Sequence, residues 1–77
     1  MGQNLRLLKG QVSDLTEHDL TIRDALLRPN HCELPADAER LPIGGSGAAP
    51  GLSNGSYVEA IITSAENCTI RTLYIRP

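Results

Sequence analysis

Few residues of this chain combine side chains that could bind a metal or attack a substrate. His31 and Cys32 are adjacent, and His18 is the other histidine. Neighbouring residues of an extended chain point in different directions, and no further Cys or His follows at a zinc-binding spacing. A Cys–His nucleophile would also need a pocket and an orienting residue. The sequence therefore predicts no catalytic residue, no metal site and no cofactor.

Two other patterns have ordinary explanations. Asp14 and Glu17 would be neighbours on a helix, and a solvated face accounts for such a pair of carboxylates. The glycine-rich run 44–51 neither follows an expected strand nor ends in the Lys-Ser/Thr pair of a phosphate-binding loop. We therefore expect a protein that is not an enzyme.

The composition limits both the core and the class of partner. The 77 residues include no Phe, no Trp and two Tyr, whereas aromatic side chains supply the largest buried areas in small cores. Leu and Ile are divided between the two ends of the chain, so we expect other subunits to complete the core. A net charge of −2 with no basic cluster predicts no nucleic-acid partner. No apolar run is long enough to cross a membrane, which predicts no membrane partner.

The segment 1–28 has the spacing of a coiled coil. Its apolar positions follow a repeat of 3.5 residues, interrupted by Asp19, which predicts a helix over residues 3–28 that Pro29 ends. Arg23 could neutralise Asp19, or Asp19 could face water at the end of the bundle. The expected oligomer seam consists of Leu5, Leu8, Val12, Leu15, Asp19, Ile22 and Leu26.

Gly10 weakens this helix, because glycine inside a helix costs about 1 kcal/mol relative to alanine. Ser13 and Thr16 could each cap a shorter helix. The alternative is therefore an irregular N-terminal arm followed by a short helix from about Ser13 or Thr16 to Arg28.

The middle segment, 29–56, is expected to be an extended arm or linker. It contains Pro29, Pro35, Pro42 and Pro50 together with five glycines. Proline removes backbone donors and glycine costs conformational entropy, so neither a helix nor a central strand is expected.

The last segment, 57–77, is expected to be a β-hairpin. Tyr57–Thr63 and Thr69–Arg76 are rich in β-branched and aromatic residues, and a five-residue loop separates them. If Ile62 lies opposite Ile70, Ala60 should face Thr72 and Val58 should face Tyr74 on one side of the hairpin. The other side should carry Ile61, Leu73 and Ile75. Both faces then carry apolar groups, so a neighbouring sheet should complete the hairpin. Leu20 and Leu27 form a second apolar stripe outside the helical seam. The residues expected to contact a partner or sheet are Leu20, Leu27, Tyr57, Ile61, Leu73 and Ile75.

Cys32 and Cys68 are the two cysteines. No signal-peptide pattern begins the chain, which favours synthesis in a cytosol, where thiols stay reduced. We therefore expect two free thiols. The alternative is a disulfide between the middle segment and the hairpin, formed if the protein later meets an oxidising medium. Asn67-Cys68-Thr69 fits the glycosylation pattern, but without a secretory route this match is a coincidence.

The expected fold class is thus α+β and non-globular, with a coiled-coil helix, a Gly/Pro-rich arm and a hairpin completed by oligomerisation. This plan resembles the small trimeric virion proteins of tailed bacteriophages, such as head fibres, decoration proteins and fibre adaptors. The resemblance is architectural and transfers no individual residue. It implies a structural protein made in the host cytoplasm and carried in the virion. Such a protein would form a homotrimer, or a dimer, and bind a capsid or tail. The alternative function is a cytosolic adaptor that binds a partner through its helix and by sheet augmentation.

Overall fold

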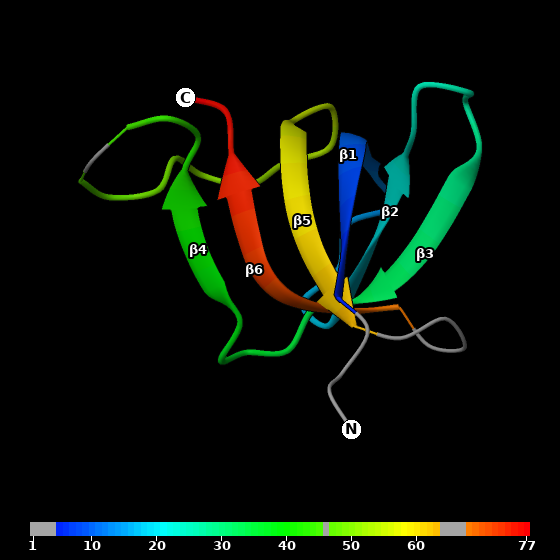
Figure 1. Cartoon of the computed structure of the whole chain (residues 1–77), viewed down its shortest axis with the longest axis horizontal. Coiled ribbons are helices and arrows are strands. Elements are labelled where there is room, and N and C mark those ends of the chain that lie inside the picture. The colour runs from blue at the N-terminus through cyan, green and yellow to red at the C-terminus, as the bar shows by residue number, and fades with distance from the viewer. Residues whose placement is uncertain (1–4, 46, 64–67) are drawn as a thin grey trace.

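The computed structural model describes residues 5–45, 47–63 and 68–77. Six strands and no helix occur in these ranges, and Figure 1 shows them wrapped around one core. The strands are β1 (Leu5–Ser13), β2 (Asp19–Arg23), β3 (Pro29–Glu33), β4 (Glu39–Pro42), β5 (Tyr57–Thr63) and β6 (Thr69–Ile75).

Five of these strands close into a barrel. The strand order is β3-β2-β1-β5-β6-β4, and β3 also pairs with β6 between Glu33 and Thr69. The β3–β6 and β4–β6 pairings are parallel, and the other pairings are antiparallel. Five strands closed in this order have the architecture of the OB-fold barrel. The fourth strand, β4, lies outside the ring, on the edge of β6.

The predicted α+β class and coiled-coil helix are wrong, because β1 and β2 occupy most of the described part of segment 1–28. Leu8 and Val12 are four residues apart, and this spacing places two side chains on one face of a strand as well as of a helix. Both are buried in the barrel, with Gly10 between them. The heptad interpretation therefore read a period of two as a period of 3.5.

The alternative short helix is also wrong. Asp14 follows β1 with a φ of 50°, a left-handed conformation that ends regular structure. Thr16 then forms a turn with Asp19, where the Thr16 hydroxyl donates to Asp19 Oδ1 at 2.8 Å. The capping signals at Ser13 and Thr16 therefore mark the turn between two strands.

The chain forms a core of its own, contrary to the expectation that other subunits would complete it, because β1 pairs with β5. Their register runs from Leu5 opposite Thr63 to Gln11 opposite Tyr57, so the apolar residues of both chain ends meet inside one barrel. The core of the described residues is therefore built mostly from Leu, Ile and Val, without an aromatic side chain. The buried apolar residues are Leu8, Val12, Leu20, Ile22, Cys32, Leu34, Val58, Ala60, Ile62, Ile70, Leu73 and Ile75.

The hairpin of β5 and β6 has a register different from the predicted one. Ile62 does lie opposite Ile70, but a bulge then shifts the pairing, so that Ile61 faces Thr72 and Ala60 faces Leu73. The extra residue of a bulge changes which residues share a face. Leu73 therefore points into the core with Ile70, rather than outward with Ile61. Residues 64–67, including Asn67 of the glycosylation pattern, lie outside the described residues.

The predicted extended arm 29–56 is folded onto the barrel. It supplies β3 and β4, and Leu34 is fully buried. Pro42 is accepted because β4 is an outer strand, where a missing N–H need not break the sheet. Leu52, in the chain between β4 and β5, packs against the core.

The cysteines form a disulfide, so the expectation of free thiols is wrong and the stated alternative is the one found. Cys32 in β3 and Cys68 before β6 are 36 residues apart in sequence, with Cα atoms 4.6 Å apart. Glu33 N–H also donates to the Cys68 carbonyl at 2.8 Å. The disulfide therefore joins β3 to β6 beside the single residue pair that closes the barrel.

Candidate functional site

The first half of β1 has an open edge. The N–H and C=O of Val12 both bond to the Gly55–Ser56 segment that leads into β5. Because bonding directions alternate along an antiparallel strand, Arg6, Leu8 and Gly10 bond toward β5. The backbone groups of Leu5, Leu7 and Lys9 therefore point to the opposite edge.

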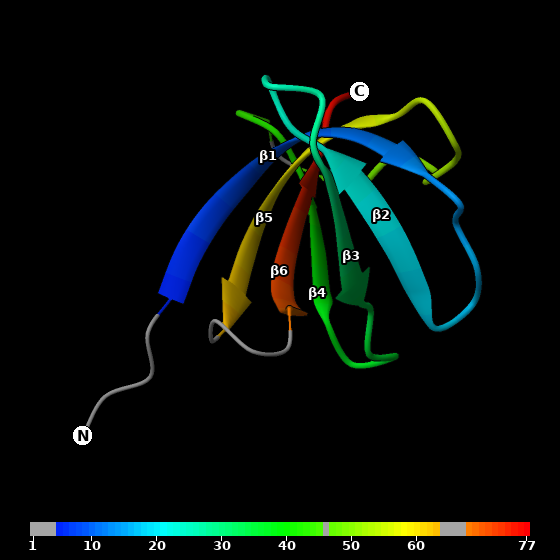
Figure 2. The ribbon, with the colours of Figure 1, turned by 90° about the vertical axis from the view of Figure 1, so that its right-hand side faces the viewer.

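No described strand covers that edge. β2 pairs with β1 over Gln11–Ser13 and turns away after Arg23. In Figure 2 the first half of β1 accordingly runs away from β2. Three N–H and three C=O groups in the described part of β1 are thus available to an added strand. We call Leu5–Lys9, with these groups, the open edge.

Apolar side chains accompany the open edge. Leu5 and Leu7 are each 54% exposed, although leucine usually lies inside a protein. Leu7 lies opposite Ile61, which is half-buried on the outer face of β5. An added strand would cover apolar surface as well as backbone groups. By contrast, β4 has four residues and ends in Pro42, features that protect an outer strand from pairing.

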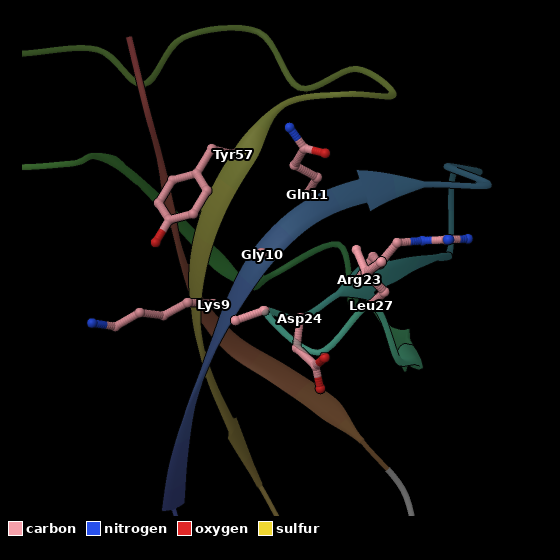
Figure 3. Close-up of a pocket in the computed structure, with 8 residues that line it drawn as sticks. Lys9, Gly10, Gln11, Arg23, Asp24, Leu27 and Tyr57 are labelled. Carbon is pink, nitrogen blue, oxygen red and sulfur yellow. The ribbon is translucent and has the colours of Figure 1, made fainter.

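The open edge ends at a pocket of about 330 Å³, since Lys9 belongs to both. The pocket lies between β1, the start of β5 and the turn after β2. Figure 3 shows the Lys9 and Tyr57 side chains on one side of β1 and the Arg23 side chain extending away on the other. The polar groups of the pocket therefore do not converge on one point, whereas catalysis would require them to do so. The lining residues are Lys9, Gly10, Gln11, Arg23, Asp24, Ala25, Leu27 and Tyr57.

Gly10 is required where β1 passes β2. A Cβ at this position would overlap the carbonyl oxygen of Arg23 and approach Ile22 Cγ2 to 3.0 Å. Glycine inside a strand often marks such a close approach. The same residue lines the pocket, so the bend of β1 and the pocket have one local cause.

The turn beside the pocket is organised by Asp24. Its Oδ1 accepts hydrogen bonds from the N–H groups of Leu26 at 2.9 Å and Arg28 at 3.0 Å. The pKa of Asp24 lies below its ordinary 3.8, chiefly because of the hydrogen bond from the Arg28 N–H. The hydrogen bonds from Asn30 and Leu26 lower this pKa further, and together these bonds outweigh the opposing effect of desolvation. Asp24 is therefore a structural anion that fixes where β2 ends.

Leu27 in this turn combines exposure with backbone strain. It is 71% exposed and has a φ of 62°, a conformation that costs an L-residue about 1–2 kcal/mol. Such strain is often retained at binding sites. Leu27 therefore gives the pocket an exposed apolar wall.

The ring of Tyr57 forms the opposite wall. The guanidinium of Arg76 lies 4.2 Å from the ring centroid, within the range of a cation–π contact. This contact holds one aromatic side chain in place at the end of the open edge.

The described residues offer no candidate metal site. They contain no group of three or more His, Cys, Asp or Glu side chains placed to hold a metal ion. His31 Nε2 lies 3.5 Å from Asp19 Oδ2, but its other ring nitrogen, Nδ1, lies 3.4 Å from the hydroxyl oxygen of Thr21. Within 5–45, 47–63 and 68–77, no helix is long and apolar enough to cross a membrane.

The β2–β3 face is unlike a nucleic-acid surface. OB-fold barrels use this face for oligonucleotides, which needs cations and stacking aromatics. Here Asp19 lies opposite Glu33, and Thr21 lies opposite His31. The described part of this face carries two acids and one arginine, Arg23, and has no Phe, Tyr or Trp ring.

The predicted seam residues are not gathered in one line. Leu8, Val12 and Ile22 are in the core, and Leu15 packs against it. Leu5, at the start of β1, and Leu26, in the turn after β2, are exposed. Asp19 is half-buried at the start of β2, bonded to Thr16 and His31 rather than to Arg23.

The residues predicted to contact a partner are likewise divided between the core, the pocket and the outer face of the barrel. Leu20, Leu73 and Ile75 are fully buried in the barrel. Leu27 and Tyr57 come together at the pocket. Ile61 lies beside Leu7 on the outer face.

Sequence reasoning missed Arg6, Lys9 and Gly10 as site residues. Leu5, Leu7, Lys9 and Gln11 alternate with the residues that β1 turns to the barrel. A test of this stretch for a period of two would have placed all four on one face.

No protein-family model matches the chain, and neither a curated protein nor a solved structure matches it. The function is therefore argued from the open edge and the pocket.

Proposed function

We propose that this chain is a non-enzymatic assembly module that accepts an extended strand of another polypeptide along the open edge of β1. The single observation that carries this proposal is the row of outward backbone groups at Leu5, Leu7 and Lys9, flanked by two exposed leucines. Strand addition to a sheet edge is a common mode of peptide recognition.

The support for β1 as the docking strand is its rigidity. β5 pairs with β1 over seven residues, Leu5–Gln11, so the open edge is held on one side along its whole length. A preformed strand loses little conformational entropy when a partner binds. The pocket at its end offers room for one side chain of that partner.

This proposal keeps the structural role and the sheet augmentation expected from the sequence and replaces the helical contact. The resemblance to phage virion proteins depended on a helix that the described residues lack, and it therefore gives this proposal no support. Residence in a virion stays a prediction. The disulfide favours a site of action outside a reducing cytosol.

The first test is amide hydrogen exchange of the isolated protein, measured by NMR. We expect Leu5, Leu7 and Lys9 to exchange quickly, and Leu8 and Gly10 to be protected by their bonds to β5. Uniform protection along β1 would mean that the edge is already covered, which would refute the proposal.

The second test selects binders from a library of extended peptides and measures their affinity for Leu7→Pro. This change removes one outward N–H without breaking the ladder to β5. We expect affinity to fall by more than about tenfold, from the lost hydrogen bond and the altered strand surface. The control Leu7→Val keeps both the N–H and the apolar contact. Selected peptides that bind Leu7→Pro normally would refute strand addition at this edge.

A further inference from the structure

We infer that the strand added to β1 is acidic, with a carboxylate opposite Lys9, an apolar residue opposite Leu7, a carboxylate opposite Arg6 and an apolar residue opposite Leu5. This inference rests on the proposed function, because it names the partner of the same edge. It follows from the charges along the edge and from the antiparallel register.

The open edge is positively charged. Arg6 and Lys9 are exposed, and the five residues Leu5–Lys9 include no acid. Neither Arg6 nor Lys9 forms an ion pair within 4.0 Å with a described residue. At the pocket the lining includes one cation beyond the edge, Arg23, and one anion, Asp24, so the surplus of positive charge lies on the open edge. The charge of the edge is therefore available to a partner.

Glu59 is the nearest acid in the ladder, directly opposite Lys9 on β5. It is half-buried and forms no ion pair with Lys9 in the described structure. An added strand would lie on the other side of Lys9, so one lysine would stand between Glu59 and a partner carboxylate. Lys9 can contact both without placing the two acids side by side.

The direction of the partner follows from β2. This strand runs antiparallel to β1 and stops at Arg23, beside the end of the open edge. A partner strand that continues the line of β2 meets Lys9 first and Leu5 last. Residues opposite Lys9, Leu7 and Leu5 then share the outer face, because opposite residues of antiparallel strands lie on one side of the sheet.

The resulting partner pattern is acid, any residue, apolar, acid, apolar. None of the 77 residues begins a segment of this pattern, so the partner is a different polypeptide rather than a second copy. Pairing two copies of Leu5–Lys9 would gather four cations on one short sheet with no acid between the strands. Charged residues on an edge are a known device against such self-pairing.

The experiment uses three capped peptides with the complete protein in its oxidised form. Their central residues are Glu-Thr-Val-Glu-Val, Gln-Thr-Val-Gln-Val and Lys-Thr-Val-Lys-Val, each flanked by Thr residues. Affinity is measured by calorimetry at low and high salt. Two cross-strand ion pairs should make the Glu peptide bind about tenfold more tightly than the Gln peptide. Salt should reduce this difference, and the Lys peptide should bind most weakly.

The protein variant Arg6→Gln/Lys9→Gln should abolish the preference for Glu over Gln while it keeps the affinity for the Gln peptide. Equal affinity of the Glu and Gln peptides for the wild-type protein would overturn the acidic partner but leave strand addition intact. An affinity for the Glu peptide that Leu7→Pro does not reduce would overturn the proposed function itself. A stable dimer that Leu7→Pro dissociates would show that a second copy occupies the edge, which would also overturn the inference.

Discussion

Loss of the Cys32–Cys68 disulfide should remove much of the stability of this barrel. The bond closes a loop of 36 residues, and the chain-entropy relation gives about 4 kcal/mol for a loop of that length. A small domain has a total free energy of unfolding of roughly 5–15 kcal/mol, with short chains near the low end. Beside the bond, β3 and β6 share one residue pair, Glu33 with Thr69, so little else holds this seam closed.

The assay is urea unfolding of the oxidised protein, the reduced protein and the variant Cys32→Ala/Cys68→Ala. The reduced protein keeps both sulfur atoms, so it measures the cross-link alone. The variant also loses buried volume at Cys32, which is fully buried, and should be destabilised slightly more. Thiol titration of the oxidised protein in denaturant should find no free thiol. A free energy of unfolding that changes by less than about 1 kcal/mol on reduction would refute this account of the closure.

Four smaller predictions concern the turns and the bend of β1, each measured by thermal or urea unfolding. Gly10→Ala should cost about 1–3 kcal/mol through its clash with the backbone of β2, whereas Gly51→Ala, whose Cβ meets nothing within 4 Å, should be nearly neutral. Leu27→Gly should stabilise the protein by up to about 1 kcal/mol, because glycine relieves the positive φ at this position. Leu26→Gly is the control at a neighbouring exposed leucine, and equal effects of the two changes would contradict this explanation. The stability contribution of Asp24 is present above its unfolded-state pKa of about 3.8 and is lost as pH falls through its lower folded-state pKa; the advantage of the wild type over Asp24→Asn should therefore shrink only in that acid range. Asp19→Ile should lower stability by removing the hydroxyl and histidine contacts of a turn, and a rise in stability would contradict this role of Asp19.

The hairpin strands were predictable because their signal is local. Tyr57–Thr63 and Thr69–Ile75 are β-branched runs around a short connection, and β-branched residues favour strands wherever they pack. The bulge was not predictable, since nothing in the residues from Ile70 to Leu73 requires the extra residue. Burial of Leu73 with Ile70 selects it once the barrel is closed.

The N-terminal half failed for a different reason. Leu8 and Val12 satisfy a helix and a strand equally, so the pattern alone could not decide between them. Gly10 was the informative residue. Its lack of a side chain matters only when β2 lies against β1, because a Cβ there would overlap the Arg23 carbonyl oxygen. The pairing of β1 with β5, some fifty residues away along the chain, decides the structure of this segment, and short-range patterns carry no trace of such a pairing.

The open edge follows from the same long-range pairing. β1 has nine residues, and β5 supports Leu5–Gln11 of them, whereas β2 supports three at the other end. β2 cannot extend further along β1, because the Asp24 carboxylate holds the N–H groups of Leu26 and Arg28 and commits the chain to turn. The first half of β1 is thus paired with β5 alone, because the fixed turn after β2 leaves it without a second neighbouring strand. An edge that persists because the adjacent turn is fixed is a stable template for a partner strand, and the cations on it restrict which strand can bind.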